Sequence, residues 1–133
     1  VNVQWIGGKK FVGTDSTNHP VAISTADEGV GMKPSELLLV ALASCSAVDV
    51  VEILAKKRLG LQSMQISASG EQDSDPPWTF RKIHLRYCLS GKGLTDKAVE
   101  QAIRLSEENY CSVAATLRGK AEITFSYEIQ PEN

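Results

Sequence analysis

Three cysteine thiols are the side chains of this sequence best suited to redox or nucleophilic chemistry. They are Cys45, Cys88 and Cys111. A thiolate attacks peroxides and disulfides, and two thiols brought together can close a transient disulfide. An odd number of cysteines argues against a framework of structural disulfides, and 133 residues can bury a core without one. We therefore expect free thiols and a reducing, cytoplasmic location.

Cys45 lies in the apolar segment ALASCSAVDVVEIL. A buried cysteine often acts only as a small apolar side chain with little reactivity. Asp49 follows one helical turn later on the same face, and a buried carboxylate needs a cation or hydrogen-bond donors. Either Asp49 holds a cation beside Cys45, for example a Lys or Arg of another subunit, or Cys45 is a poor nucleophile at neutral pH.

Cys111 stands where one helix is expected to end and another to begin. The free N–H groups of a helix N-terminus favour a thiolate, so this position favours reactivity, although Cys111 could equally fill a tight corner. Cys88 alternates with apolar residues on an expected strand and is the weakest candidate.

Metal and nucleotide sites are not indicated by any motif. His84 and Cys88 are four residues apart on an expected strand, about 13 Å, which is too far for two ligands of one ion. The sequence has no CxxC, HExxH, GxGxxG or GxxxxGK[ST] pattern, so we expect no cofactor. A net charge of −2 with scattered Lys and Arg argues against nucleic acid as a partner.

Neither export nor membrane insertion is expected from the sequence. Its first residues, VNVQWIGGKK, lack the apolar core and cleavage site of a signal peptide. The most apolar stretch, 37–43, is followed by Asp49 and Glu52, so we expect it to fall short of a membrane span and the protein to be soluble.

The elements that must position the thiols follow from residue patterns. Residues 1–6, 9–15 and 20–25 predict three short strands between turn formers, a β-meander. A long helix is expected from Pro34, the first helical position, to about Arg58. No linker divides the chain, so we expect one domain over residues 1–133.

The second half predicts three further strands and two helices. The strands are expected at 64–72, 78–90 and 121–129, with the alternation of one buried face in the second. An amphipathic helix is expected over 95–109, with a short helix from Cys111. The fold class is therefore α+β.

The long helix is apolar on every side from Leu37 to Ala43 and must be covered on every side. The remaining short elements of one chain could hardly enclose a rod of about 36 Å. We therefore expect a second copy to supply the missing cover in an intertwined homodimer.

Two segments together carry a resemblance to a known family. GMKPSELLLVALASCSAVDVVEILAKKRLGL, followed by SEENYCSVAATLRGKAEITFSYEI, resembles the OsmC/Ohr family and most closely its short YhfA-like branch. The resemblance covers nearly the whole chain. It implies an OsmC-like α+β homodimer in which sheets of both chains wrap two long central helices.

The resemblance also implies a chemistry for oxidative stress. Members with known activity are peroxidases, oxidoreductases that reduce organic hydroperoxides: a central-helix thiolate becomes a sulfenic acid, which a second cysteine resolves as a disulfide. By position, Cys45 matches the peroxidatic thiol and Cys111 the resolving thiol. A dithiol reductant would complete the cycle, and Leu38 and Leu42 would line an apolar substrate pocket.

The chain departs from the family pattern at the activating residues. Peroxidase members carry a Glu after the helix-opening Pro, which orients an Arg from the N-terminal strands. Ser35 stands at the Glu position, and Glu36 would point to the far side of the helix from Cys45. Lys9 or Lys10 would have to replace the Arg, without its bidentate fork. Ser112 is a minor change from the family's frequent Pro.

Three functions are therefore left open by the sequence. The first is a thiol peroxidase using Cys45 and Cys111, and the second is a non-catalytic OsmC-like dimer that binds a small apolar or acidic metabolite. The third is a structural domain with inert cysteines.

Overall fold

The computed structural model describes residues 1–132 and falls into two units, the first ending at Leu38 and the second beginning at Leu39. The first unit contains strands β1 (Asn2–Trp5), β2 (Lys10–Thr14) and β3 (Pro20–Ser24) in one antiparallel sheet. Its first turn uses Gly7 and Gly8 at φ 105° and 55°, conformations that glycine adopts without strain. The predicted meander is confirmed.

Helix α1 spans Pro34–Lys56 and ends close to the predicted Arg58, which has a positive φ of 58°. Its fully buried residues recur every fourth position: Leu42, Ser46, Val50 and Leu54. This spacing places them on one face of the helix. The chain therefore buries one face of α1 and leaves apolar side chains exposed elsewhere on it.

By length and composition alone, α1 is long and apolar enough to cross a membrane. The expectation that this segment falls short of a span is wrong on that criterion, because Asp49 and Glu52 do not lower the mean hydropathy enough. Core helices of soluble proteins pass the same test. One face of α1 packs into the core of the second unit.

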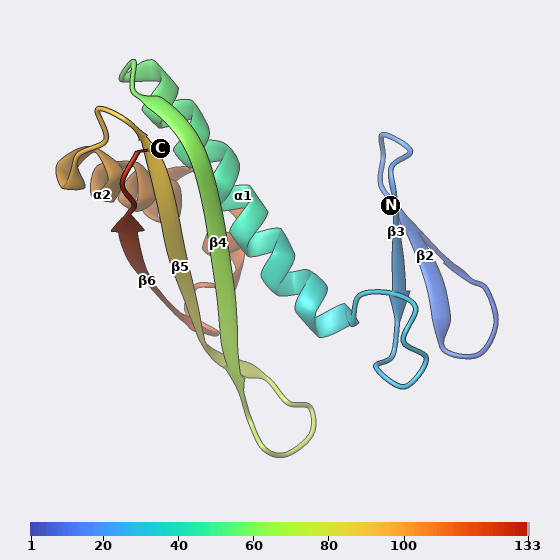
Figure 1. The fold of residues 1–133 in the computed structure, drawn as a ribbon. Helices are drawn as coiled ribbons and strands as arrows, with labels where there is room; N and C mark the ends of the chain where they lie inside the picture. Colours follow the sequence, from blue (N-terminus) through green and yellow to red (C-terminus); the bar gives the residue numbers. More distant parts are fainter. Residues whose placement is uncertain (133) are drawn as a thin grey trace. The chain divides into compact units, whose positions relative to one another are not determined.

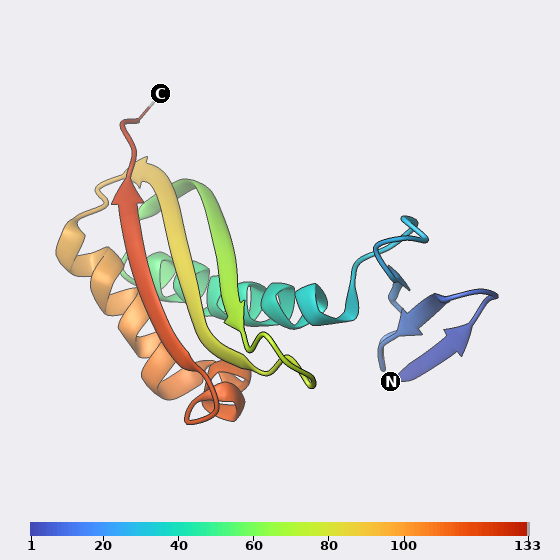
Figure 2. The same ribbon diagram turned by 90° about the horizontal axis from the view of Figure 1, so that it is seen from below.

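The second unit is built on a sheet of three longer strands in the order β4-β5-β6 (Figure 1). These are β4 (Gly60–Gln72), β5 (Phe80–Lys92) and β6 (Glu122–Ile129). Strands β4 and β5 pair antiparallel, whereas β5 and β6 pair parallel. A parallel pair needs a crossover, and the helices between β5 and β6 provide it. Helices α1 and α2 lie on the same face of this sheet (Figures 1 and 2).

Three helical segments make up the crossover. Helix α2 (Asp96–Leu105) begins at Thr95, whose hydroxyl accepts the Ala98 N–H at 3.2 Å as an N-cap. A π-helical turn, η1 (Ser106–Tyr110), follows and leads to α3 (Ser112–Leu117). The predicted helix over 95–109 is therefore α2 plus a wider turn, and the short helix after Cys111 is confirmed.

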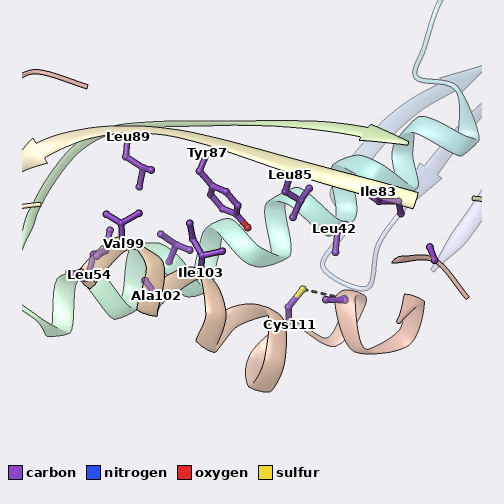
Figure 3. Close-up of a cluster of buried hydrophobic side chains, with 14 residues drawn as sticks. Leu42, Leu54, Ile83, Leu85, Tyr87, Leu89, Val99, Ala102, Ile103 and Cys111 are labelled. Carbon is purple, nitrogen blue, oxygen red and sulfur yellow. Dashed lines mark hydrogen bonds between the residues drawn. The ribbon is translucent and has the colours of Figure 1, made fainter. Parts of the chain in front are cut away.

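The core lies between the sheet and these helices (Figure 3). Its fully buried side chains include Ile83, Leu85, Tyr87 and Leu89 of β5, Leu42, Val50 and Leu54 of α1, and Val99 and Ile103 of α2. Each large apolar side chain removed from water contributes roughly 1.5–3 kcal/mol. The predicted alternation along β5 is confirmed, because these residues face inward while the residues between them face away from the core.

Candidate functional site

The structure brings Cys45 and Cys111 together from two different elements. Cys45 lies in the middle of α1 and is partly buried, whereas Cys111 is only 2% exposed and caps the N-terminus of α3. The backbone N–H of Ala114 donates to Cys111 Sγ at 3.3 Å (Figure 3). The two thiols are close enough for each to shift the pKa of the other.

Hydrogen bonding stabilises the thiolate form of Cys45. Burial alone raises the pKa of Cys45, but hydrogen bonding from the Val113 N–H, the Cys111 thiol, and the hydroxyl and N–H of Ser112 outweighs it. The pKa of Cys45 is therefore lower than its usual value of 9.0. This environment fits a reactive thiol better than an inert apolar filler.

Cys111 is shifted in the opposite direction. Burial raises the pKa of Cys111 to about 11, because the Ala114 N–H offsets desolvation only in part and the neighbouring Cys45 adds to the rise. The Ala114 N–H at the helix N-terminus lowers the pKa of Cys111 as expected, but the net shift is upward. Burial outweighs the cap at Cys111, and the N–H groups of this helix start favour the thiolate of Cys45 instead.

These opposite shifts make Cys45 the more acidic of the two thiols. The pair holds one proton on Cys111 and a thiolate on Cys45 more readily than the reverse. A thiolate beside a protonated thiol can attack an electrophile and then be attacked by its neighbour. The arrangement is therefore suited to dithiol redox chemistry.

Asp49 finds a hydrogen-bond donor within its own chain. The hydroxyl of Ser106, the first residue of η1, donates to Asp49 Oδ2 at 2.8 Å. Ser106 Oγ also lies 3.2 Å from Ser46 Oγ, which lies 2.5 Å from the Tyr87 hydroxyl. The sequence left two alternatives for Asp49, a cation beside Cys45 or a poorly nucleophilic Cys45. Neither is needed, because Ser106 supplies the hydrogen-bond donor that the carboxylate requires.

Sequence reasoning missed Ser46, Tyr87 and Ser106. One signal was available, since a tyrosine at an inward position of a buried strand needs a partner for its hydroxyl. The serines carry no comparable signal, because serine is also common on exposed helix faces. Burial raises the pKa of Tyr87 to about 12, so its phenol stays protonated at physiological pH.

Asp49 also borders an open pocket of about 590 Å³. Its other lining residues are Glu52, Ile53, Lys56, Lys57, Leu105 and Tyr110. Asp49 therefore lines this pocket while it accepts the hydrogen bond of Ser106. Leu42, predicted to contact substrate, is fully buried in the core, and its proposed role stays a prediction.

The other predicted supporting residues, and Leu38 of the predicted substrate pocket, lie in the first unit. Lys10 is on β2, while Ser35, Glu36 and Leu38 occupy the first turns of α1. Glu36 Oε1 forms an ion pair with Lys33 Nζ at 3.0 Å. Lys9, the other candidate to replace the family arginine, pairs with Asp27 at 2.9 Å. Two of the charged candidates for thiol activation are thus engaged within this unit.

Cys88 is separate from the other two cysteines. It lies on the face of β5 that points away from the core, where Arg86 Nη1 donates to its sulfur at 2.8 Å and Arg86 also pairs with Glu128 at 2.8 Å. Within residues 1–132, no group of three His, Cys, Asp or Glu side chains is arranged to hold a metal ion.

Comparisons with known proteins agree with this architecture. Residues 26–126 match the family of OsmC-like proteins. Protein YhfA of Escherichia coli K12 is 35% identical over 127 residues, which cover 96% of this chain and 95% of that protein. The crystal structure of a hypothetical protein from Aquifex aeolicus has a TM-score of 0.89 at 32% identity, covering 99% of this chain and 96% of that one.

A more distant structure shares the fold alone. An organic hydroperoxide resistance protein OsmC from Legionella pneumophila has a TM-score of 0.68 at 14% identity. The match covers 96% of this chain and 95% of that one.

Proposed function

Because the chain belongs to the OsmC-like protein family, which includes peroxide-resistance proteins, we propose that it is a thiol-dependent peroxidase acting on organic hydroperoxides. Cys45 is the nucleophile and Cys111 the resolving thiol. The observation that carries this proposal is the pairing of a Cys45 thiol of lowered pKa with a protonated Cys111.

The chemical steps require only the two thiols, a hydroperoxide and a reductant. The Cys45 thiolate attacks the terminal oxygen of ROOH, the O–O bond breaks, and ROH leaves after taking up a proton. The resulting Cys45 sulfenic acid is attacked by the Cys111 thiol, which forms the disulfide and releases water. A dithiol reductant then restores both thiols and leaves as its own disulfide.

The N–H groups of Ser112 and Val113 support this role in place of the family's Glu and Arg pair. They favour negative charge on Cys45, as the missing guanidinium would. A backbone N–H carries no net charge, so we expect a slower peroxidase than members with the complete pair.

A homodimer is part of the proposal. Val40, Val48 and Val51 of α1 are 44%, 58% and 46% exposed, an apolar stripe on one helix of the second unit. Exposed apolar stripes on a central helix favour association, most simply with a second copy about a twofold axis. A cytoplasmic location stays a prediction that rests on the free thiols.

The proposal is tested by exposing the reduced protein to cumene hydroperoxide. We expect peroxide to be consumed and mass spectrometry to find a Cys45–Cys111 disulfide. Cys45→Ser abolishes consumption, and Cys111→Ser leaves a Cys45 sulfenic acid that dimedone traps. Cys88→Ser is the matched control and behaves as wild type. Absence of the disulfide at a modest excess of peroxide rejects the enzyme.

The alternative is a non-catalytic dimer that binds a small apolar or acidic metabolite. Ser35 at the family's Glu position and the ion pair of Glu36 with Lys33 favour it. In that case, metabolites raise the melting temperature equally in wild type and Cys45→Ser, and cumene hydroperoxide is not consumed.

A further inference from the structure

A chain of buried hydroxyl groups joins the two segments that carry the reactive cysteines. Tyr87 and Ser106 are 0% exposed and Ser46 is 1% exposed, yet all three side chains are polar. Burying a hydroxyl without a partner costs free energy, so each hydroxyl here must be hydrogen-bonded. The contacts described above satisfy all three and end at the Asp49 carboxylate.

The direction of these hydrogen bonds follows from the number of hydrogens. Ser106 has one hydroxyl hydrogen, and the ionised carboxylate of Asp49 can only accept, so Ser106 donates to Asp49. Ser46 Oγ is a second, longer contact of the same Ser106 hydroxyl, and Ser46 and Tyr87 share a hydrogen bond in which either hydroxyl can donate. The bond to the carboxylate is charge-assisted and at 2.8 Å is shorter than the Ser46–Ser106 contact, so Asp49 is the strong anchor of the chain.

Each serine is linked directly to one cysteine. Ser46 is the residue after Cys45 on α1. The carbonyl of Ser106 accepts the backbone N–H of Cys111 at 2.7 Å, the bond that closes the π-helical turn η1. A π-helical turn is less favourable than a regular helix and persists where its surroundings hold it, often at functional sites.

We propose that Ser106 is a positioning residue that holds the η1 turn against α1 and thereby keeps the Cys111 thiol facing Cys45. Its carbonyl fixes the backbone of Cys111, and its hydroxyl fixes the turn to Asp49 and Ser46. This inference rests on the proposed function for the use of the thiol pair. Asp49 thereby anchors the resolving cysteine and activates neither thiol.

The consequence is a high effective concentration of one thiol at the other. Two groups held in a productive geometry react far more readily than the same groups on mobile segments. Without the Ser106 hydroxyl, η1 can move relative to α1, and the Cys45–Cys111 disulfide becomes harder to form.

The test measures this effective concentration in a glutathione redox buffer, without peroxide. Glutathione disulfide oxidises the two thiols to the Cys45–Cys111 disulfide and leaves as two glutathione molecules. We expect Ser106→Ala to lower the equilibrium constant for this disulfide about tenfold. Asp49→Ala should act likewise, whereas Asp49→Asn, which keeps an acceptor for Ser106, should stay within about threefold of wild type.

Ser90→Ala is the matched control. Ser90 is 9% exposed, and its hydroxyl bonds to Ser63 at 2.6 Å, so its removal also costs one partly buried hydrogen bond. We expect its disulfide equilibrium to equal that of wild type within twofold. If Ser106→Ala and Ser90→Ala give the same equilibrium, Ser106 is merely structural and the inference is wrong. If Ser106→Ala does not fold, an unchanged equilibrium in Asp49→Ala overturns it equally.

The two proposals fail separately. If the wild-type protein forms the disulfide in the glutathione buffer but does not consume cumene hydroperoxide, the peroxidase proposal is rejected. The positioning role of Ser106 can still be tested by the disulfide equilibrium. If wild type and Ser106→Ala consume peroxide equally well and have equal disulfide equilibria, only the positioning role of Ser106 is rejected.

Discussion

The thiols of Cys45 and Cys111 have pKa values shifted in opposite directions, although both cysteines belong to the same core. Cys111 is the more deeply buried, so desolvation dominates there and raises its pKa to about 11. Cys45 is partly exposed, and N–H groups at the start of α3 lower the pKa of its thiol. Depth of burial therefore explains the rise at Cys111, and hydrogen bonding explains the fall at Cys45.

The first prediction is that iodoacetamide alkylates Cys45 before the other core thiol. We expect the Cys45 rate to follow a pKa lower than 9.0, whereas Cys111 stays unmodified at pH 7 because it is protonated and 2% exposed. Mass spectrometry of peptides across a pH series measures both rates. Equal labelling of the two cysteines at pH 7 would contradict the assignment.

The second prediction concerns the Cys111 thiol as a hydrogen-bond donor to Cys45. Cys111→Ala removes one of the groups that lower the pKa of Cys45, so alkylation of Cys45 at pH 7 should slow about three- to tenfold. Cys88→Ala, on the opposite face of the sheet, should leave the rate unchanged. If Cys45 is alkylated at the wild-type rate in Cys111→Ala, the Cys111 thiol does not lower the pKa of Cys45.

Much of the fold could be predicted from the sequence because its signals are local. Pro34 at the first helical turn and the alternation from Ile83 to Leu89 each arise within one element. The parallel pairing of β5 with β6 could not be predicted this way, since it depends on the crossover through α2 and α3. The π-helical turn also has no local signature, because SEENY reads as an ordinary helical segment.

The site could be predicted only in part. Resemblance to a family, rather than spacing, matched Cys45 with Cys111. The partner of Asp49 was not predictable, because Ser106 is distant in the sequence and a serine on an amphipathic helix carries little information. The direction of the pKa shift at Cys111 was missed because its burial is a tertiary effect that outweighs the cap.

The third prediction follows from Glu107, whose Oε1 is buried without a hydrogen-bond partner. Burial raises the pKa of Glu107 from 4.5 to about 7, opposed by Arg118 and Arg104. Between these two pH values the folded state binds more protons than the unfolded state. The ionisation of Glu107 therefore lowers the free energy of unfolding of the protein as pH rises from 4.5 through 7. Discounted for partial exposure, the loss is about 1–2 kcal/mol.

Glu107→Gln should remove that dependence. Urea unfolding at pH 5 and pH 8 measures the change, and the variant should gain stability over wild type at pH 8 but not at pH 5. The neighbouring exposed Glu108→Gln is the control and should follow wild type at both values. A gain at pH 5 as large as at pH 8 would show that ionisation of Glu107 is not the cause.

The fourth prediction tests the homodimer through Val48, the most exposed valine of the α1 stripe at 58%. Val48→Glu places a charge on each copy at the proposed interface, where desolvation and like-charge repulsion oppose association. We expect dissociation to monomers at micromolar concentration in sedimentation velocity. Gln62→Glu, an exposed position on β4, should leave the dimer intact. A wild-type protein that sediments as a monomer removes the basis for this prediction.

The fifth prediction separates stability from reactivity at Tyr87. Tyr87→Phe keeps the buried ring but removes the hydroxyl that lies 2.5 Å from Ser46 Oγ. Loss of one buried hydrogen bond should lower the free energy of unfolding by about 1–2 kcal/mol. Cys45 alkylation should stay within twofold of wild type, because Tyr87 is not among the groups that shift the pKa of Cys45.

Urea denaturation with an unchanged m-value is the measurement, and Tyr127→Phe on edge strand β6 is the control, with an expected loss below about 0.5 kcal/mol. If Tyr87→Phe is as stable as wild type, the hydroxyl contributes no net stability. If it instead slows Cys45 alkylation tenfold while stability is kept, Tyr87 acts on the thiol itself, and the hydroxyl chain belongs to the reactive centre rather than to its support.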